Sequence, residues 1–375
     1  MDTKNTDVIN IFTHPPATAV EAIERILGSA VAMNASDIHC DPLVRCLTIK
    51  FRIDGSLEEI GMLPHTMHEE FIARLKIMCG ARTDVHAVPQ DGRWKAEIGR
   101  SSYNIRISFM PTYHGENAVL RILTSDHGGE VTFAGLGFIP DHVACINTAL
   151  TKSHGLILAV GPTGSGKTTT LHACLTAKLR ERISIITLED PIEYEIPGVR
   201  QVHIRHSHGV TFASGLRSVL RQDPDIIMVG EIRDSETARI AIHTALTGHL
   251  VFSTLHTNSA IEAITRLADM GVDHYLLAST MRLIIGQRLV RTFCSKCHGM
   301  GCQGCRYCGY AGRSIIAEIC EIEDELSKLI SERRPSNTYK EYVKKKGWRS
   351  MLDDGLEKVE WGMTSREEVL KVLEN

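Results

Sequence analysis

The hydrophobic and polar positions of the chain follow one pattern in its first third and another in the remainder. In the first part, short alternating runs are interspersed with stretches whose apolar residues recur at helical spacing. Two helices and three strands are expected there: helices over 19–33 and 71–78, and strands over 47–53, 95–98 and 103–109. Asp54-Gly55 after the first strand is typical of a hairpin turn. This mixture predicts a small α+β domain over residues 1–125.

A stretch rich in Gly, Asp and Ser precedes the second pattern and predicts a linker over residues 126–140. After it, runs that are apolar throughout alternate with helical segments. The expected strands are 155–160, 183–188, 226–229 and 250–254. Such strands, separated by helices, are typical of a mostly parallel sheet covered on both faces. The pattern over residues 141–375 therefore predicts an α/β domain whose helical tail begins at Asp324.

The composition narrows the class of protein. A length of 375 residues agrees with two or three domains, and a hydrophobic content of 43% is enough to form buried cores. A net charge of -3, without a basic stretch interleaved with aromatic residues, disfavours a nucleic-acid partner. The apolar runs are far shorter than the ~20 residues that span a bilayer, and the first residues are polar. We therefore expect a cytoplasmic protein that does not insert directly into a membrane.

A phosphate-binding loop stands between the first expected strand of the second domain and a helix. The sequence GPTGSGKT matches G-x-x-x-x-G-K-[ST] at every position, in the strand and helix context that supports such a match. The loop's N–H groups and the helix N-terminus favour phosphate. Lys167 is expected on the β- and γ-phosphates of ATP, and Thr168 on Mg²⁺. The candidate nucleotide-binding residues are Gly161, Pro162, Thr163, Gly164, Ser165, Gly166, Lys167, Thr168 and Thr169.

Two further expected strands end in carboxylates. Glu231 follows the apolar run 226–229 and Gly230, the layout of a Walker B strand, and has the reach to orient an attacking water. Glu189 begins an acidic cluster after the run 183–188, where it is a candidate for polarising water or holding Mg²⁺. A solvated acidic turn is the alternative interpretation for Glu189.

Two histidines bracket the last expected strand of this group. His256 lies just past its end and is a candidate sensor of the γ-phosphate. His249 precedes the strand, and a structural role is equally compatible with its position.

Five of the eleven cysteines lie between Cys294 and Cys308. Two C-x-x-C pairs this close together favour a tetrahedral Zn²⁺ site with a structural role, since four thiolates leave no open coordination position. Cys305 and Cys308 share the spacing of Cys302 and Cys305, so spacing alone leaves open which of them form the second pair.

Taken in order, these motifs resemble those of the secretion ATPase superfamily, the motors of type II secretion and type IV pili. The resemblance also covers Ser36-Asp37-Ile38-His39, Arg52-Ile53-Asp54-Gly55, Val88 to Arg93 and Gly215 to Glu231. It implies a RecA-like P-loop NTPase domain, a smaller PAS-like N-terminal domain and a zinc knuckle over 291–313. It further implies that Arg106 and Arg121, and more weakly Arg93, contact the γ-phosphate.

The resemblance also indicates which cysteines would bind zinc and which partners the protein would have. Relatives with the knuckle carry a G-C-x-x-C pair before G-Y-x-G-R, which favours Cys294, Cys297, Cys302 and Cys305 as the zinc ligands. It implies a homohexamer that works beside the inner face of the cell membrane on a polytopic platform protein. The knuckle and the tail resemble assembly motors for a type IV pilus, a type II secretion pseudopilus or a competence pseudopilus. A retraction motor is the nearest alternative, and a zinc-dependent, nucleic-acid-binding ATP switch is a more distant one.

Overall fold

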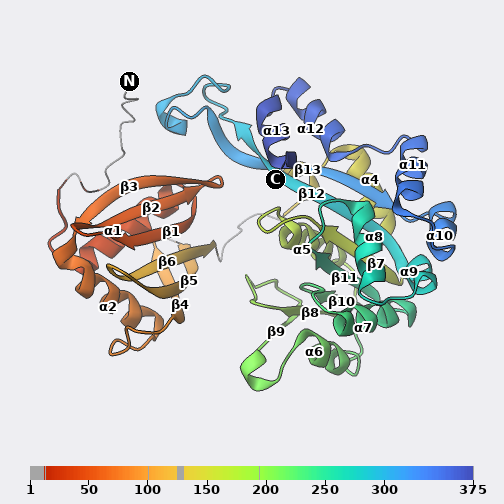
Figure 1. Ribbon diagram of the computed structural model, residues 1–375, viewed down its shortest axis with the longest axis horizontal. Helices are drawn as coiled ribbons and strands as arrows, with labels where there is room; N and C mark the ends of the chain where they lie inside the picture. Colours follow the sequence, from red (N-terminus) through yellow and green to blue (C-terminus); the bar gives the residue numbers. More distant parts are fainter. Residues whose placement is uncertain (1–11, 13, 100, 125–130, 194, 375) are drawn as a thin grey trace. The chain divides into compact units, whose positions relative to one another are not determined.

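The chain forms two compact units, Met1–Gly128 and Gly129–Asn375 (Figure 1). The computed structural model describes residues 12, 14–99, 101–124, 131–193 and 195–374. Each unit has a hydrophobic core of its own. Of the expected linker, residues 126–130 lie outside the described residues. The rest belongs to the second unit, where Phe133 and Phe138 pack into the core.

The first unit is built on a six-stranded antiparallel sheet with the order β3-β2-β1-β6-β5-β4. Its strands are β1 (Ala35–Pro42), β2 (Cys46–Ile53), β3 (Ser56–Pro64), β4 (Gln90–Ile98), β5 (Ser101–Thr112) and β6 (Gly115–Thr124). Its helices are α1 (Ala19–Ala32), the 3-10 turn η1 (His65–Met67) and α2 (His68–Cys79). The predicted hairpin is confirmed: Asp54 and Gly55 both have positive φ, as a tight turn between β2 and β3 requires.

One face of this sheet is apolar because alternate residues of each strand point to it. Phe51, Ile107 and Leu120 are buried there and share a core with Ile26 of α1 and Phe71 of α2. The residues between them in sequence lie on the opposite face, which is therefore polar.

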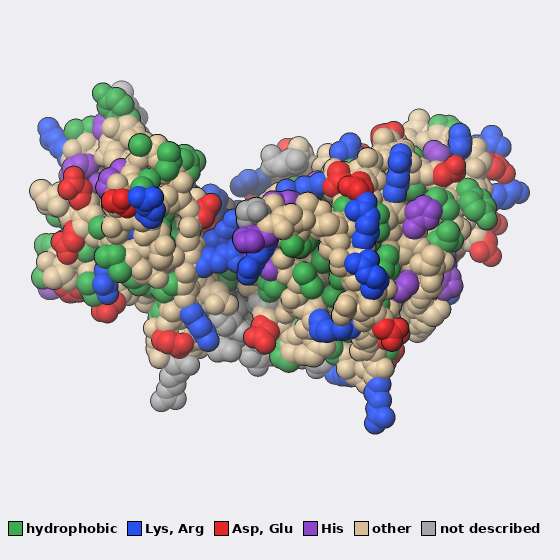
Figure 2. All heavy atoms as spheres, turned by 90° about the horizontal axis from the view of Figure 1, so that it is seen from below, with side chains coloured by type: hydrophobic (Ala, Val, Ile, Leu, Met, Phe, Trp, Pro, Cys, Tyr) green, Lys and Arg blue, Asp and Glu red, His purple; other side chains and the backbone are tan. Residues whose placement is uncertain are grey.

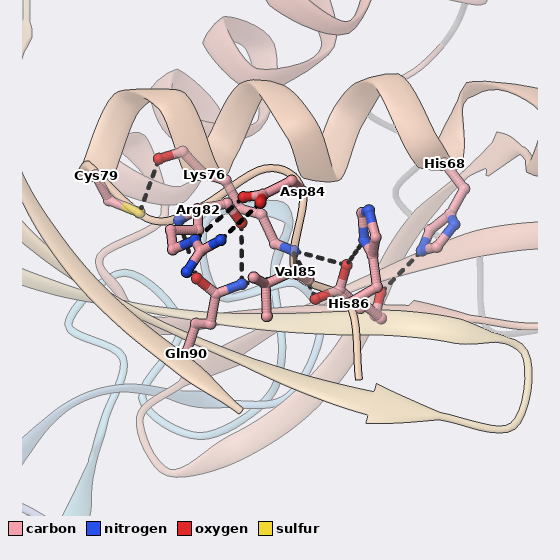
Figure 3. Close-up of polar contacts among 9 residues, drawn as sticks. His68, Lys76, Cys79, Arg82, Asp84, Val85, His86 and Gln90 are labelled. Atoms are coloured by element: carbon pink, nitrogen blue, oxygen red, sulfur yellow. Dashed lines mark hydrogen bonds and ion pairs between the residues drawn. The ribbon is translucent and has the colours of Figure 1, made fainter. Parts of the chain in front are cut away.

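A buried lysine fastens the loop between α2 and β4 (Figure 3). Lys76 Nζ donates to the backbone oxygen of Val85 at 2.6 Å and lies 2.7 Å from a carboxylate oxygen of Glu116. His86 Nδ1 contacts the other oxygen of Glu116 at 2.7 Å. The Lys76 side chain is fully buried, so the Glu116 carboxylate is needed to offset its desolvation.

The second unit contains a seven-stranded sheet with the order β13-β12-β7-β11-β10-β8-β9. Its strands are β7 (Gly155–Val160), β8 (Ile185–Glu189), β9 (Arg200–His203), β10 (Ile226–Val229), β11 (Leu250–Leu255), β12 (Met281–Phe293) and β13 (Tyr310–Glu321). Every pairing except that of β12 with β13 is parallel. The mostly parallel sheet predicted from the apolar runs is confirmed, and the long antiparallel pair β12–β13 is an addition to it.

Helices cover both faces of this sheet, and two separate apolar clusters fill the layers between (Figure 1). The helices are α3 (Phe133–Leu136), α4 (Pro140–Leu150), α5 (Lys167–Lys178), η2 (His206–His208), α6 (Phe212–Val219), α7 (Ser235–Leu246), α8 (Ala260–Asp269), α9 (His274–Thr280), η3 (Gln303–Cys305), α10 (Asp324–Ser331), α11 (Ser336–Lys345), α12 (Met351–Glu360) and α13 (Arg366–Glu374). The last four form the predicted helical tail. No helix within the described ranges is long and apolar enough to cross a bilayer.

Candidate nucleotide site and cysteine cluster

The carboxyl ends of four neighbouring parallel strands carry the candidate nucleotide residues. β7 leads into the phosphate loop, β8 ends at Glu189, β10 leads to Glu231, and β11 leads to His256. Ligands bind at this edge of a parallel sheet because the loops of adjacent strands meet there. Thr254 Oγ1 donates to the backbone oxygen of Gly230 at 2.7 Å and so joins the ends of β10 and β11.

The lysine of the phosphate loop forms hydrogen bonds back to the start of the loop. Lys167 begins α5, and its Nζ donates to the backbone oxygens of Gly161 and Pro162, at 2.8 Å each. Burial lowers the pKa of Lys167 to about 8, although the Glu231 carboxylate opposes this shift. A group desolvated in this way gains from a phosphate partner, since the phosphate restores a favourable interaction for the charged form.

The remaining loop residues divide between the interior and the surface. Gly161 and Ser165 are buried, Pro162, Gly166 and Thr169 are half-buried, and Thr163, Gly164 and Thr168 are exposed. Gly166, which precedes α5, has φ 87°, a left-handed conformation that glycine adopts without steric cost. Thr168 thus offers its hydroxyl at the first turn of α5, as a Mg²⁺ ligand requires.

Glu231 forms an ion pair with a residue that the sequence analysis had not selected. Arg233 Nη2 lies 2.7 Å from Glu231 Oε1, and His256 Nε2 lies 3.6 Å from Oε2. The Glu231 carboxylate raises the pKa of Arg233. Burial, followed by the nearby Lys167 ammonium, lowers the pKa of His256. The structure therefore brings Glu231, His256 and Lys167 into one electrostatic group.

Glu189 lies in the interior and has its own polar partners. Its Oε1 accepts hydrogen bonds from Thr187 Oγ1 at 2.6 Å and Gln201 Nε2 at 2.9 Å, and its Oε2 is 3.5 Å from His172 Nε2. Burial by itself would raise the pKa of Glu189, but the hydrogen bonds, that of His172 foremost, produce a net lowering. The solvated acidic turn is wrong for this residue, because Glu189 is 2% exposed.

Arginines form a row across the polar face of the first unit's sheet. The strand register pairs Arg93 with Arg106, Arg106 with Arg121, and Asp37 with both Arg121 and Arg52. Residues paired in this way lie side by side on one face. Asp37 is the acidic member of the row, and Arg121 Nε lies 2.9 Å from its Oδ1. The two arginines that the resemblance singles out are thus direct neighbours.

Four cysteines converge between β12 and β13. The Sγ atoms of Cys294, Cys297, Cys302 and Cys305 all lie within 4.8 Å of one another. The distances between Sγ atoms are 3.9 Å for Cys294–Cys302, 3.6 Å for Cys297–Cys305 and 3.8 Å for Cys302–Cys305. Ligands at the usual Zn–S bond length of ~2.3 Å in a tetrahedron are separated by roughly 3.8 Å. The group therefore fits Zn²⁺.

Cys308 lies outside this group. Its side chain is exposed, and its Sγ lies near the backbone oxygens of Cys305 and Tyr310. The predicted set of four is thus the one that the structure brings together, and Cys308 is not part of it.

Comparison with known proteins identifies the family. A family model described as "Type II/IV secretion system protein" matches residues 15–371. The chain belongs to this family. The type II secretion system protein HxcR of Pseudomonas aeruginosa is 40% identical over 375 residues, which cover 98% of this chain and 79% of that protein. The type II secretion system ATPase E of Vibrio cholerae is 38% identical, with 95% and 75% of the two chains covered.

A solved structure supports the same assignment for this secretion ATPase. The crystal structure of the pilus retraction motor PilT with bound ADP is similar at a TM-score of 0.70 and 27% identity. The similarity covers 93% of this chain and 96% of that one. The fold is thus that of a RecA-like P-loop NTPase with a smaller PAS-like N-terminal unit, and the protein is an ATPase.

Several polar residues around the site of this secretion ATPase escaped the sequence analysis. Arg233 and His172 contact the two candidate carboxylates, and Gln287 of β12 contacts the phosphate loop. A signal for Gln287 was present, because Gln287-Arg288 interrupts an otherwise apolar strand run. His172 stands inside the helix that follows the phosphate loop, where nothing in the sequence singles it out.

Proposed function

We propose that this secretion ATPase is the motor that drives assembly of a type II secretion pseudopilus or a related type IV pilus. One observation supports this most strongly: the complete phosphate loop, the strand-end Glu231 and the four-cysteine group occur in a chain 40% identical to a type II secretion protein along almost its whole length. The competence pseudopilus stays within the same proposal, since its motor would use the same site.

Each site residue has a distinct role in the proposed hydrolysis. Lys167 holds the β- and γ-phosphates, Glu231 orients the attacking water, and His256 responds to the presence of the γ-phosphate. Mg²⁺, when bound through Thr168, neutralises charge on the phosphates. Glu189, at the end of β8, would need to exchange its present hydrogen-bond partners to contact water or metal. Hydrolysis would depend mainly on the positioning of ATP and the attacking water and on stabilisation of the charge on the phosphates.

Arg106 and Arg121 are proposed to stabilise the charge that develops on the γ-phosphate. Their place in one register row gives two adjacent guanidinium groups on a rigid strand pair. Such groups bind phosphate oxygens in a fixed geometry. Loss of the γ-phosphate would break these arginine contacts, and the proposed motor would convert that loss into movement of the N-terminal unit.

The cysteine group is proposed to hold one structural Zn²⁺. Cys294, Cys297, Cys302 and Cys305 would supply all four ligands, so the metal would take no part in hydrolysis. It would fix the irregular connection between β12 and β13.

The proposed assembly is a homohexamer in the cytoplasm at the inner face of the cell membrane, docked on a polytopic platform protein. Of the two motor directions, assembly is favoured because the identity to type II secretion proteins is 38–40%, against 27% to PilT. On the face drawn in Figure 2, Lys and Arg side chains of the larger unit are interspersed with Asp and Glu. The net charge of -3 offers little support for the nucleic-acid switch.

The decisive experiment measures ATP turnover of the wild type, Lys167→Ala and Glu231→Gln, with the oligomeric state determined on the same samples. We expect a hexameric wild type that hydrolyses ATP. Lys167→Ala is expected to lose nucleotide binding, and Glu231→Gln to bind nucleotide with turnover reduced at least ~100-fold. Wild-type turnover in Lys167→Ala, or a monomer with nucleotide present, would overturn the proposal. Stimulation of turnover by DNA would instead favour the switch.

A further inference from the structure

Strand β12 runs beside the strand that leads into the phosphate loop and contacts the loop itself. It pairs with β7 in parallel, with Gly286 opposite Val160, so Gln287 lies beside the loop that follows Val160. The Gln287 side chain is fully buried, and its Nε2 donates to the backbone oxygen of Ser165 at 2.8 Å.

The packing between Gln287 and the loop is tight at both ends of the loop. A Cβ added at Gly161 would lie 2.5 Å from the Gln287 backbone oxygen, and one added at Gly166 would lie 3.2 Å from Nε2. Real Cβ atoms do not approach backbone as closely as 2.5 Å, so Gly161 is the residue that allows the strand to come so near. Gln287 therefore touches the loop through both its backbone and its side chain.

The hydrogen bond to Ser165 determines the direction of the next N–H group. In a planar trans peptide the C=O of Ser165 and the N–H of Gly166 point in opposite directions. If Gln287 holds this carbonyl on the β12 side, the Gly166 N–H points away from β12. N–H groups aimed in this way are what a phosphate loop uses to bind phosphate oxygens.

We propose that Gln287 is a positioning residue for nucleotide binding: it holds the Ser165–Gly166 peptide in the orientation that presents the Gly166 N–H to a nucleotide phosphate. The assignment of the amide is settled by chemistry, because the Ser165 carbonyl only accepts and must face the NH₂ group. In the part of the chain described, Gln287 Oε1 has no hydrogen-bond partner. The side chain therefore contacts the loop through its donor group alone.

Arg288 fixes the backbone of Gln287 from the other side of the strand. Its Nη1 donates to the Gln287 backbone oxygen at 3.1 Å, and its Nη2 donates to that of Asn258 at 3.3 Å. Asn258 lies two residues beyond His256, in the loop that follows β11. Two consecutive residues of β12 thus contact both the phosphate loop, through Gln287, and the loop that follows β11 and contains His256, through Arg288.

The test compares two variants of the full-length protein, Gln287→Met and Gln287→Glu, in titrations with a fluorescent ATP analogue between pH 5.5 and 8. Met has a similar shape and no donor, and we expect about tenfold weaker binding at every pH. A carboxylate at this position would face the Ser165 carbonyl and repel it, so Gln287→Glu is expected to bind at least ~100-fold more weakly at pH 8. Its affinity relative to wild type should recover as pH falls, because the protonated carboxyl donates a hydrogen bond.

Thr292→Val is the matched control, since it removes a donor from the same strand far from the loop, where Thr292 Oγ1 bonds to the Ala311 backbone oxygen. It is expected to bind like wild type. Recovery at low pH in Gln287→Glu alone would support the positioning role, because a residue that only fills space has no reason to regain function on protonation. Wild-type affinity in a folded Gln287→Met variant would overturn it, and this variant introduces no charge that could prevent folding. Equal losses in both variants without recovery would also overturn it.

Discussion

Arg121 of β6 is held by Asp37 of β1, with Nε 2.9 Å from Oδ1. The contact is made by Nε and does not involve the two terminal nitrogens of the guanidinium. Asp37 is nearly buried, and its second oxygen accepts from Ser36 Oγ at 2.7 Å. An arginine fixed in this way is oriented without being fully neutralised, which is the condition for a group that must later bind a phosphate.

Replacement of Asp37 is therefore expected to lower kcat while KM for ATP changes little. Asp37→Ala removes the acceptor and the charge, and kcat should fall roughly 10-fold to 100-fold, the scale of one hydrogen bond to a charged group. Steady-state kinetics would measure this. Arg52→Ala is the control, because Arg52 Nε is 4.0 Å from the same carboxylate and has no proposed catalytic role. Unchanged turnover in Arg121→Ala would instead refute the role of Arg121 itself.

ATP affinity is expected to fall as pH rises through about 8. Burial lowers the pKa of Lys167 to about 8, and phosphate binds the charged form. Above that pH, binding must first restore the proton, which reduces affinity by up to ~10-fold per pH unit. Between pH 8 and the ordinary lysine range, the unfolded chain binds a proton that the folded chain lacks, so this group makes folding more favourable as pH rises there.

Calorimetric titrations in buffers of different ionisation enthalpy measure the proton taken up when ATP binds. Uptake should be largest near pH 9 in the wild type and absent in Lys167→Arg, whose guanidinium stays charged. The same uptake in both proteins would assign the proton to another group.

The purified protein is expected to contain about one Zn²⁺ per chain. Serine at Cys294, Cys297, Cys302 or Cys305 should abolish retention of the metal, and the melting temperature should fall by several degrees because the ligands lose their common partner. Elemental analysis and thermal unfolding measure the two effects. Cys308→Ser is the internal control and should match the wild type in both. A loss of zinc in that variant would contradict the proposed ligand set.

Lys76→Met is expected to destabilise the N-terminal unit by about 3 kcal/mol, since it leaves the buried Glu116 carboxylate without its lysine. Denaturant unfolding followed by the fluorescence of Trp94, which packs against the core of this unit, would measure this. Adding Glu116→Gln to Lys76→Met should recover part of the loss. Arg82→Ala, which breaks only an exposed pair with Asp84, should leave the midpoint unchanged.

The sequence was most informative where chemistry is local. The phosphate loop, the Walker B strand and the cysteine pairs are each defined by residues within a dozen positions of one another, and the structure places them as their spacing predicts. The strand ends could also be located, because buried parallel strands are apolar throughout and stop at their first charged residue.

Contacts between distant segments were beyond reach. Gln287 and Ser165 are 122 positions apart, and only the parallel pairing of β12 with β7 brings them together. The acidic sequence neighbours of Glu189 left a solvated turn open as an alternative, whereas His172 of α5 and Gln201 of β9 contact its buried carboxylate. The arginine row depends on the register of five strands, and a shift of one residue would have dispersed it over both faces.

The position of Cys308 makes the molecule easy to label. It is the exposed member of the eleven cysteines, while its four neighbours would be protected from alkylation by a bound metal. A maleimide dye applied briefly to native protein would attach at the turn between β12 and β13. A single probe there, introduced without any mutation, would report on each subunit of a working motor.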